Sequence, residues 1–278
     1  MKTWLITGIS RGLGRALAEA ALERGDTVIG TVREGAPAIE TGRGALHLRS
    51  LEITDPAAVE RVVAEAFSVT GRVDVLVNNA GYGLLGAIED ASDDEVERLF
   101  AVNLVGPFRL IRAALPRLRQ QGSGHIVNIT SIAGRAPMAS SGLYAAAKSG
   151  MEGLSQSLAQ EVAPLGIKVT AVAPGGFRTD FLSDHSIRRS GSAVARAYEA
   201  TVGRALDHLD AMAGRQIGDP ARAAQAIIAA VEADTPPLHL LLGSDALART
   251  RVKLDAMREE MDCWESVTTG TDFPGETS

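Results

Sequence analysis

The sequence predicts an α/β fold: a doubly wound, seven-stranded parallel sheet with helices on both faces. Strand-like and helix-like segments alternate along the 278 residues, and the strands are mostly continuous apolar runs, as strands buried on both faces should be. The predicted strands cover 3–7, 27–32, 45–50, 73–77, 124–130, 167–173 and 238–242. The predicted helices cover 12–24, 56–70, 92–121, 143–163 and 219–233. No internal boundary or repeat is visible, so a single domain over 1–278 is expected.

Three of the predicted helices begin with recognisable capping residues. Ser92 followed by Glu95 is a capping box, in which the side chain of each residue bonds the other's backbone N–H. Asp55-Pro56 and Asp219-Pro220 place a capping acid directly before a proline at the first helical position. These signals fix where the helices start and support the alternation of elements.

The first strand runs into a glycine-rich loop, Gly8-Ile9-Ser10-Arg11-Gly12-Leu13-Gly14, and the loop opens the first helix. Glycines let the backbone approach a pyrophosphate, and the helix N-terminus offers free N–H groups and partial positive charge. A glycine loop at this junction therefore predicts a dinucleotide site at the carboxyl ends of the strands.

Tyr144 and Lys148 are separated by three alanines, a spacing that predicts a helix with both side chains on one face. A nearby cation favours the phenolate and lowers the tyrosine pKa. The expected result is a phenol able to exchange a proton near neutral pH, as acid–base chemistry on a carbonyl or alcohol requires. Ser131 lies upstream, after the predicted strand 124–130.

These motifs together resemble the short-chain dehydrogenase/reductase family, in its shorter NADP-dependent subgroup. The resemblance covers about residues 1–180, in the family's order. It is carried by Thr7-Gly8-x-x-x-Gly12-x-Gly14, Asn78-Asn79-Ala80-Gly81, Asn103, Ser131, Tyr144-x-x-x-Lys148 and Pro174-Gly175-Gly176-Phe177-Arg178-Thr179. The resemblance implies a single-domain Rossmann fold and an oxidoreductase that transfers a hydride between a nicotinamide cofactor and a carbonyl or alcohol.

The resemblance also implies a role for each catalytic position. Tyr144 exchanges a proton with the substrate oxygen, and Ser131 hydrogen-bonds that oxygen as an oxyanion donor would. Lys148 lowers the tyrosine pKa and bonds the nicotinamide ribose, while Asn103 holds a relay water. The implied cofactor-binding residues are Gly8, Ser10, Arg11, Gly12, Leu13, Gly14, Arg33, Glu52, Ile53, Asn79, Ala80, Gly81, Tyr144, Lys148, Pro174, Gly175, Phe177 and Thr179.

Two arginines favour NADP(H) over NAD(H). An NAD site usually ends its second strand with an acid that bonds the ribose 2′-OH, whereas here Arg33 follows Val32 and precedes Glu34. Arg11 lies inside the glycine loop, and planar guanidinium groups suit a 2′-phosphate. Glu52 departs mildly from the family's aspartate or asparagine at the adenine contact.

The composition argues against several kinds of partner and of structural site. A formal charge of −6 argues against nucleic acid or an anionic membrane as a partner. A single cysteine excludes an intrachain disulfide, and five scattered histidines suggest no metal site. We find no apolar stretch near the ~18 residues of a membrane span, and we expect a cytoplasmic protein that forms a homo-oligomer, either a dimer or a tetramer.

The substrate is the least specified feature. The segment 180–215 is expected to form a lid that closes over a small hydrophobic carbonyl or alcohol substrate, a steroid-like ring among them. Its Ser190-Gly191-Ser192-Ala193 stretch offers little to bury. The extension 243–278 exceeds the family's minimal length and is expected to cover the pocket or a subunit contact. Two alternatives are a non-catalytic NADP-binding redox sensor and an epimerase or dehydratase of the family's longer branch. The first should lack the tyrosine or lysine, and the second should have another glycine spacing and a larger C-terminal domain.

Overall fold

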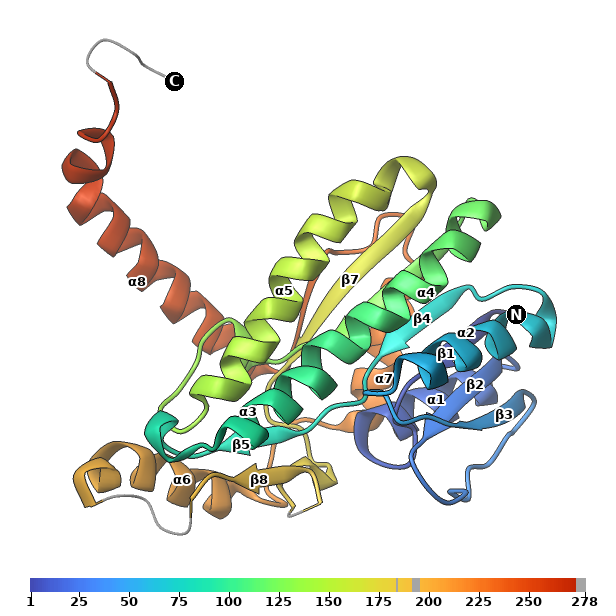
Figure 1. The fold of residues 1–278 in the computed structure, drawn as a ribbon, viewed down its shortest axis with the longest axis horizontal. Coiled ribbons are helices and arrows are strands. Elements are labelled where there is room, and N and C mark those ends of the chain that lie inside the picture. Colours follow the sequence, from blue (N-terminus) through green and yellow to red (C-terminus); the bar gives the residue numbers. More distant parts are fainter. Residues whose placement is uncertain (184, 192–195, 274–278) are drawn as a thin grey trace.

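The computed structural model describes residues 1–183, 185–191 and 196–273 and contains the predicted parallel sheet (Figure 1). Its seven strands run in the order β3-β2-β1-β4-β6-β7-β9, and every neighbouring pair is parallel. They are β1 Thr3–Ile6, β2 Thr27–Val32, β3 Ala45–Ser50, β4 Val75–Asn78, β6 Gly124–Ile129, β7 Ile167–Pro174 and β9 His239–Leu242. Since the chain leaves β1 in one direction and later returns to β4 on its other side, the crevice of a doubly wound sheet opens between β1 and β4.

Helices cover both faces of this sheet, as predicted. One apolar layer joins the sheet to α1 and α7 through residues such as Leu17 and Ile227, and the other joins it to α2, α4 and α5 through residues such as Val62 and Leu110. The helices are α1 Gly12–Glu23, α2 Pro56–Thr70, α3 Asp93–Phe100, α4 Gly106–Gln121, α5 Gly142–Val162, α6 Arg204–Met212, α7 Pro220–Glu232 and α8 Ser244–Thr269.

The predicted caps form as expected. Ser92 and Glu95 make both bonds of the capping box at the start of α3. The carboxylate of Asp55 accepts the Ala57 N–H at α2, and that of Asp219 accepts the first free N–H groups of α7. Local sequence therefore determines these three helix starts without help from distant contacts.

The prediction of one helix over 92–121 is only partly right. A π-helical turn at Ala101–Val105 separates α3 from α4. Such turns carry one residue too many for a regular helix, and they often lie at functional sites. Here the turn carries Asn103, whose side chain bonds both backbone polar groups of Tyr82.

The expectation that no stretch is long and apolar enough to span a membrane is wrong for this same region. Within Asp93–Gln121, one 18-residue window has a mean hydropathy of 1.3, and 39% of that window is buried in the protein. Leu99, Leu110 and Leu118 are fully buried here. The apolar character is that of a helix packed on the core of the sheet.

Residues 180–215 contain structure that the sequence patterns did not reveal. β8 (Ile187–Arg189) pairs in parallel with β5 (Gly83–Leu85), and α6 follows. Ile187, Tyr198 and Leu209 pack on an apolar cluster that includes Leu85. Ser192 and Ala193 were predicted to make this segment flexible, and Val194 was predicted to help cover the substrate. These three residues lie outside the described residues.

The extension after β9 forms the single long helix α8, which extends away from the rest of the protein (Figure 1). Only its first two turns pack on the body, where Ala246 and Thr250 are buried. Every described residue from Arg251 to Phe273 is exposed.

Candidate active site

A cavity of about 560 Å³ opens at the carboxyl ends of the strands. All the residues predicted for catalysis or cofactor binding line it, with the exception of Asn103. Asn103 is buried behind the loop that connects β4 to β5. The motifs that are scattered over the sequence therefore meet in one place.

The glycine loop forms a cradle with no room for side chains. Gly8 and Gly12 have φ angles of +73° and +60°, which side-chain-bearing residues rarely adopt. A Cβ on Gly14 would lie 2.2 Å from the Asn79 amide nitrogen and 2.4 Å from the Gly8 carbonyl oxygen. No side chain caps the N-terminus of α1, so its first N–H groups are available to an anion. This cradle fits a dinucleotide pyrophosphate.

Thr7 and Asn79 lock this loop to the end of β4. The Thr7 hydroxyl accepts the backbone N–H groups of Asn79 and Ala80 at 2.9 and 3.0 Å. The Asn79 amide donates to the carbonyl oxygens of Thr7 and Gly8 at 2.8 and 3.0 Å. The cradle is therefore held in shape by four partly buried hydrogen bonds.

Tyr144 and Ser131 reach the cavity from α5 and from the loop after β6. The Ser131 hydroxyl accepts the Ala133 N–H at 3.1 Å, which fixes its orientation. Burial raises the pKa of Tyr144 to about 12, although a side-chain hydrogen bond with Ser131 acts to lower it. The phenol is therefore protonated throughout the neutral range in this structure.

Lys148 lies one turn further along α5, as its spacing predicts. Its ammonium group donates to the Ile129 carbonyl oxygen at 2.9 Å and lies 5.8 Å from the Tyr144 ring centroid. Burial lowers the pKa of Lys148 to about 8, while the Glu152 carboxylate acts in the opposite direction. The expected lowering of the Tyr144 pKa by Lys148 is not found, because desolvation of the buried phenol dominates.

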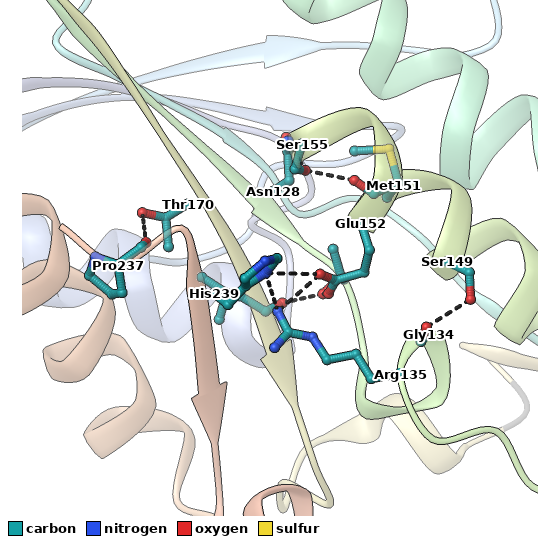
Figure 2. Close-up of polar contacts among 12 residues, drawn as sticks. Asn128, Gly134, Arg135, Ser149, Met151, Glu152, Ser155, Thr170, Pro237 and His239 are labelled. Atoms are coloured by element: carbon teal, nitrogen blue, oxygen red, sulfur yellow. Dashed lines mark hydrogen bonds and ion pairs between the residues drawn. The ribbon is translucent and has the colours of Figure 1, made fainter. Parts of the chain in front are cut away.

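Glu152, a further turn along α5, ties this helix to the loop that carries Ser131. Figure 2 shows Arg135 and His239 both directed at the Glu152 carboxylate, at 2.9 and 3.5 Å. The Thr130 hydroxyl also donates to Glu152. Since Thr130 and Arg135 flank Ser131 in sequence, the buried carboxylate fixes the loop relative to Tyr144 and Lys148. A second bond, from the Ser149 hydroxyl to the Gly134 carbonyl oxygen, joins the same two elements.

Asn103 and Lys148 both lie close to Gly81. A Cβ on Gly81 would lie 3.0 Å from the Asn103 carbonyl oxygen and 3.6 Å from the Lys148 ammonium nitrogen. The Asn103 side chain accepts the Tyr82 N–H and donates to the Tyr82 carbonyl oxygen. Its visible function is to hold the β4–β5 loop.

The two predicted arginines both line the cavity, but they have different surroundings. Arg33 is exposed at the end of β2 and lines the cavity. Arg11 donates from its guanidinium group to the His185 carbonyl oxygen at 2.7 Å, which links the glycine loop to the segment 180–215. The Glu52 carboxylate bonds Thr54, and this bond lowers the pKa of Glu52.

Several lining residues were missed in the sequence. The Asp245 carboxylate, in the first turn of α8, accepts the Gly176 N–H at 2.7 Å, and Arg249 donates to the Ala136 carbonyl oxygen. Gln216 is buried beside Gly176, and among the described residues neither end of its amide has a hydrogen-bond partner. Asp245 follows the carboxyl end of a predicted strand, a position that could have drawn attention to it.

Known proteins resemble both the sequence and the structure. Residues 2–189 match the family model described as short chain dehydrogenase. The chain belongs to the short-chain dehydrogenase family. An oxidoreductase, BOA17, from Botryotinia fuckeliana is 36% identical over 270 residues, which are 96% of this chain and 97% of that protein.

Solved structures of short-chain dehydrogenases share its fold. One from Streptomyces avermitilis is 42% identical, with a TM-score of 0.87 over 98% of this chain and all of the other. A metagenomic short-chain oxidoreductase in complex with NADP is 28% identical, with a TM-score of 0.66 over 87% of this chain and 96% of the other. This short-chain dehydrogenase is thus an oxidoreductase that acts on CH–OH or C=O groups of small molecules with a nicotinamide cofactor.

Within the described ranges, no three His, Cys, Asp or Glu side chains gather where they could hold a metal ion.

Proposed function

We propose that the protein is an NADP(H)-dependent oxidoreductase that interconverts a ketone or aldehyde and the corresponding alcohol, with Tyr144 as general acid and base. The observation that carries the proposal is the meeting of Ser131, Tyr144 and Lys148 at one wall of the cavity. The Phe181 ring centroid lies 5.9 Å from that of Tyr144.

In the reductive direction Tyr144 gives its proton to the carbonyl oxygen. A pKa near 12 keeps that proton on the phenol until the oxygen becomes strongly basic in the transition state. Ser131 donates a hydrogen bond to the same oxygen and stabilises the charge that develops on it. When bound, the nicotinamide supplies or accepts the hydride.

Lys148 provides the positive charge beside this proton transfer. Its ammonium group is fixed by the Ile129 carbonyl oxygen and faces the Tyr144 ring. As the phenol loses its proton, the nearby cation favours the phenolate more than it favoured the neutral phenol. Lys148 and Tyr144 would also bind the nicotinamide ribose, and Asn103 would hold a relay water.

The preference for NADP(H) rests on Arg33. This exposed guanidinium group lines the end of the cavity where a ribose 2′-phosphate would lie, and no acid ends β2. The NADP complex of the similar metagenomic enzyme supports the same cofactor. Arg11 would serve as the second phosphate ligand from the glycine loop.

The substrate is proposed to be a small hydrophobic carbonyl or alcohol. The cavity wall near Tyr144 is lined by apolar side chains, namely Leu85, Met138, Phe181, Leu182, Ile187, Leu209 and Met212. The segment 180–215 would act as the lid of this end. Since members of the family are typically oligomeric, we also propose a homo-oligomer.

One experiment tests the reaction directly. The protein is mixed with NADPH and a panel of aldehydes and ketones, and the loss of the nicotinamide absorbance is followed. Turnover of at least one hydrophobic carbonyl is expected. Tight NADPH binding without turnover of any carbonyl, and without oxidation of the matching alcohols, would favour the redox sensor instead.

A further inference from the structure

α8 carries an apolar stripe whose side chains are all exposed. Four large side chains, at positions 254, 257, 261 and 264, are spaced by three, four and three residues and therefore lie along one face. They are Leu254, Met257, Met261 and Trp264, exposed by 58%, 42%, 62% and 59%. We call these four residues the α8 seam. A regular 3-4 spacing of apolar residues is the pattern by which one helix packs against another.

The residues beside the seam are also typical of a helix that packs against a second helix. With the seam at positions a and d of a heptad, the flanking e positions hold Arg251, Arg258 and Glu265, and the g positions hold Lys253, Glu260 and Val267. Charged residues at e and g are those that set partner and orientation in coiled coils. An isolated helix that is exposed on all sides is marginal in water, so a partner also explains why this one persists beyond the body.

We infer that the α8 seam is the contact with a second copy of this chain, and that the two copies of α8 run antiparallel. The charged residues at the e and g positions determine the relative direction of the two helices. A parallel pair would bring g against e, and so Lys253 against Arg258 and Glu260 against Glu265 of the second copy. Each of these pairs is a repulsion, and symmetry would double it.

An antiparallel pair brings e against e and g against g. One antiparallel register places Glu265 opposite Arg258 of the second copy. The register shifted by one heptad places Glu265 opposite Arg251 but also sets the two copies of Arg258 opposite each other, so the charges favour the first register. Each attraction again occurs twice by symmetry. An isologous contact of this kind closes on itself and gives a dimer rather than a fibre.

The first turns of α8, and not the seam, contact the wall of the cavity. Asp245 bonds Gly176 and Arg249 bonds Ala136, so α8 is attached at its first turns to two loops of the cavity wall. The seam begins only beyond Thr250. The second copy would therefore be held at a distance from the cavity, and its loss should leave the reaction intact.

The oligomeric mass of the full-length protein tests the contact. Met257→Glu with Trp264→Glu should lower the mass by one half in light scattering after gel filtration, because two charges enter the seam. Val252→Glu is the control, since Val252 is an apolar residue exposed by 70% on the same helix but lies at the f position. The control should keep the mass of the unchanged protein. A monomeric unchanged protein, or a seam variant with the control's mass, would overturn the inference.

Disulfide trapping tests the orientation in a Cys263→Ser background. Glu265→Cys mixed with Arg251→Cys or Arg258→Cys should give a cross-linked pair. Cross-linking of Glu265→Cys with Glu260→Cys, and with neither arginine variant, would show a parallel pair and contradict the antiparallel arrangement.

Discussion

The rings of Tyr144 and Phe181 lie 5.9 Å apart and are tilted by 46°. Tyr144 belongs to α5, whereas Phe181 belongs to the short 3₁₀ turn Asp180–Leu182 that starts the segment 180–215. The proposed proton donor and the proposed lid are therefore in direct aromatic contact. Any movement of this segment changes the surroundings of the phenol.

Tyr144→Phe should retain cofactor binding and lose nearly all turnover. The change removes the phenol oxygen and keeps the ring packing, and a general acid contributes typically ~10²–10⁴-fold. Steady-state kcat and NADPH fluorescence titration measure the two effects. Tyr198→Phe is the control and should leave both unchanged, because it removes a phenol that packs on the cluster around Leu85 and is not among the residues that line the cavity. A Tyr144 variant that kept most of its rate would exclude the proposed mechanism.

Phe181→Ala and Leu182→Ala should change substrate preference and leave NADPH affinity nearly unchanged. Both side chains line the cavity, whereas the cradle for the pyrophosphate is formed by the glycine loop and the residues after β4. The measurement is relative kcat/KM over a series of carbonyls that differ in size. A uniform loss over the whole series would mean that these residues only support the fold.

Arg33→Ala should weaken NADPH far more than NADH. A charge-assisted hydrogen bond is worth roughly 1.5–3 kcal/mol, which is about 10–150-fold in affinity. The ratio of kcat/KM for the two cofactors is the readout, and Arg61→Ala, an exposed arginine on α2, is the control. Equal kcat/KM values for NADPH and NADH in the unchanged protein would contradict the assignment of NADP(H).

Lys148 should make the protein more stable as the pH rises above 8. Its pKa is about 8 in the fold against 10.5 in an ordinary environment. Between these values the unfolded chain holds a proton that the folded chain has lost, so stability rises by at most ~1.4 kcal/mol per pH unit. Urea unfolding of the unchanged protein and of Lys148→Met should diverge from pH 8 to 10. Parallel curves would place the lysine pKa outside this window.

Glu152→Gln should reduce both stability and turnover. The carboxylate holds Arg135, His239 and Thr130 at once, and bonds to a charged group are worth about 1.5–3 kcal/mol each. Its loss also lowers the pKa of Lys148 further, which should shift the alkaline limb of the pH–rate profile to lower pH. Glu161→Gln, an exposed site on the same helix, should change neither. An unshifted profile would leave Glu152 with a role in folding alone.

The parts of the fold that local sequence encodes were predictable. Continuous apolar runs gave the seven strands, and capping pairs such as Ser92 with Glu95 gave helix starts. The strands β5 and β8 were not found, because three residues each are too few to show a period. The π-helical turn at Asn103 was hidden for a similar reason, since one extra residue barely changes a helical pattern.

In the candidate site, too, local features could be predicted and contacts between distant segments could not. Spacing alone placed Tyr144 and Lys148 on one face of a helix. It could not give the pKa of Tyr144, which depends on burial by residues distant in sequence, such as Phe181. Nor could it show that Arg11 bonds His185 or that Asp245 reaches Gly176, because these contacts join segments separated by 174 and 69 residues.

The attachment of α8 to the cavity wall also sets the order in which the protein can mature. A ribosome that has delivered the first 180 residues has supplied every recognisable motif, and domains form from their N-terminal side during synthesis. The nascent chain still lacks β9, the edge strand of the sheet, and the carboxylate of Asp245 that secures Gly176. The site is therefore completed only after Asp245 has been translated, and chains that terminate before this residue carry the motifs without a finished pocket.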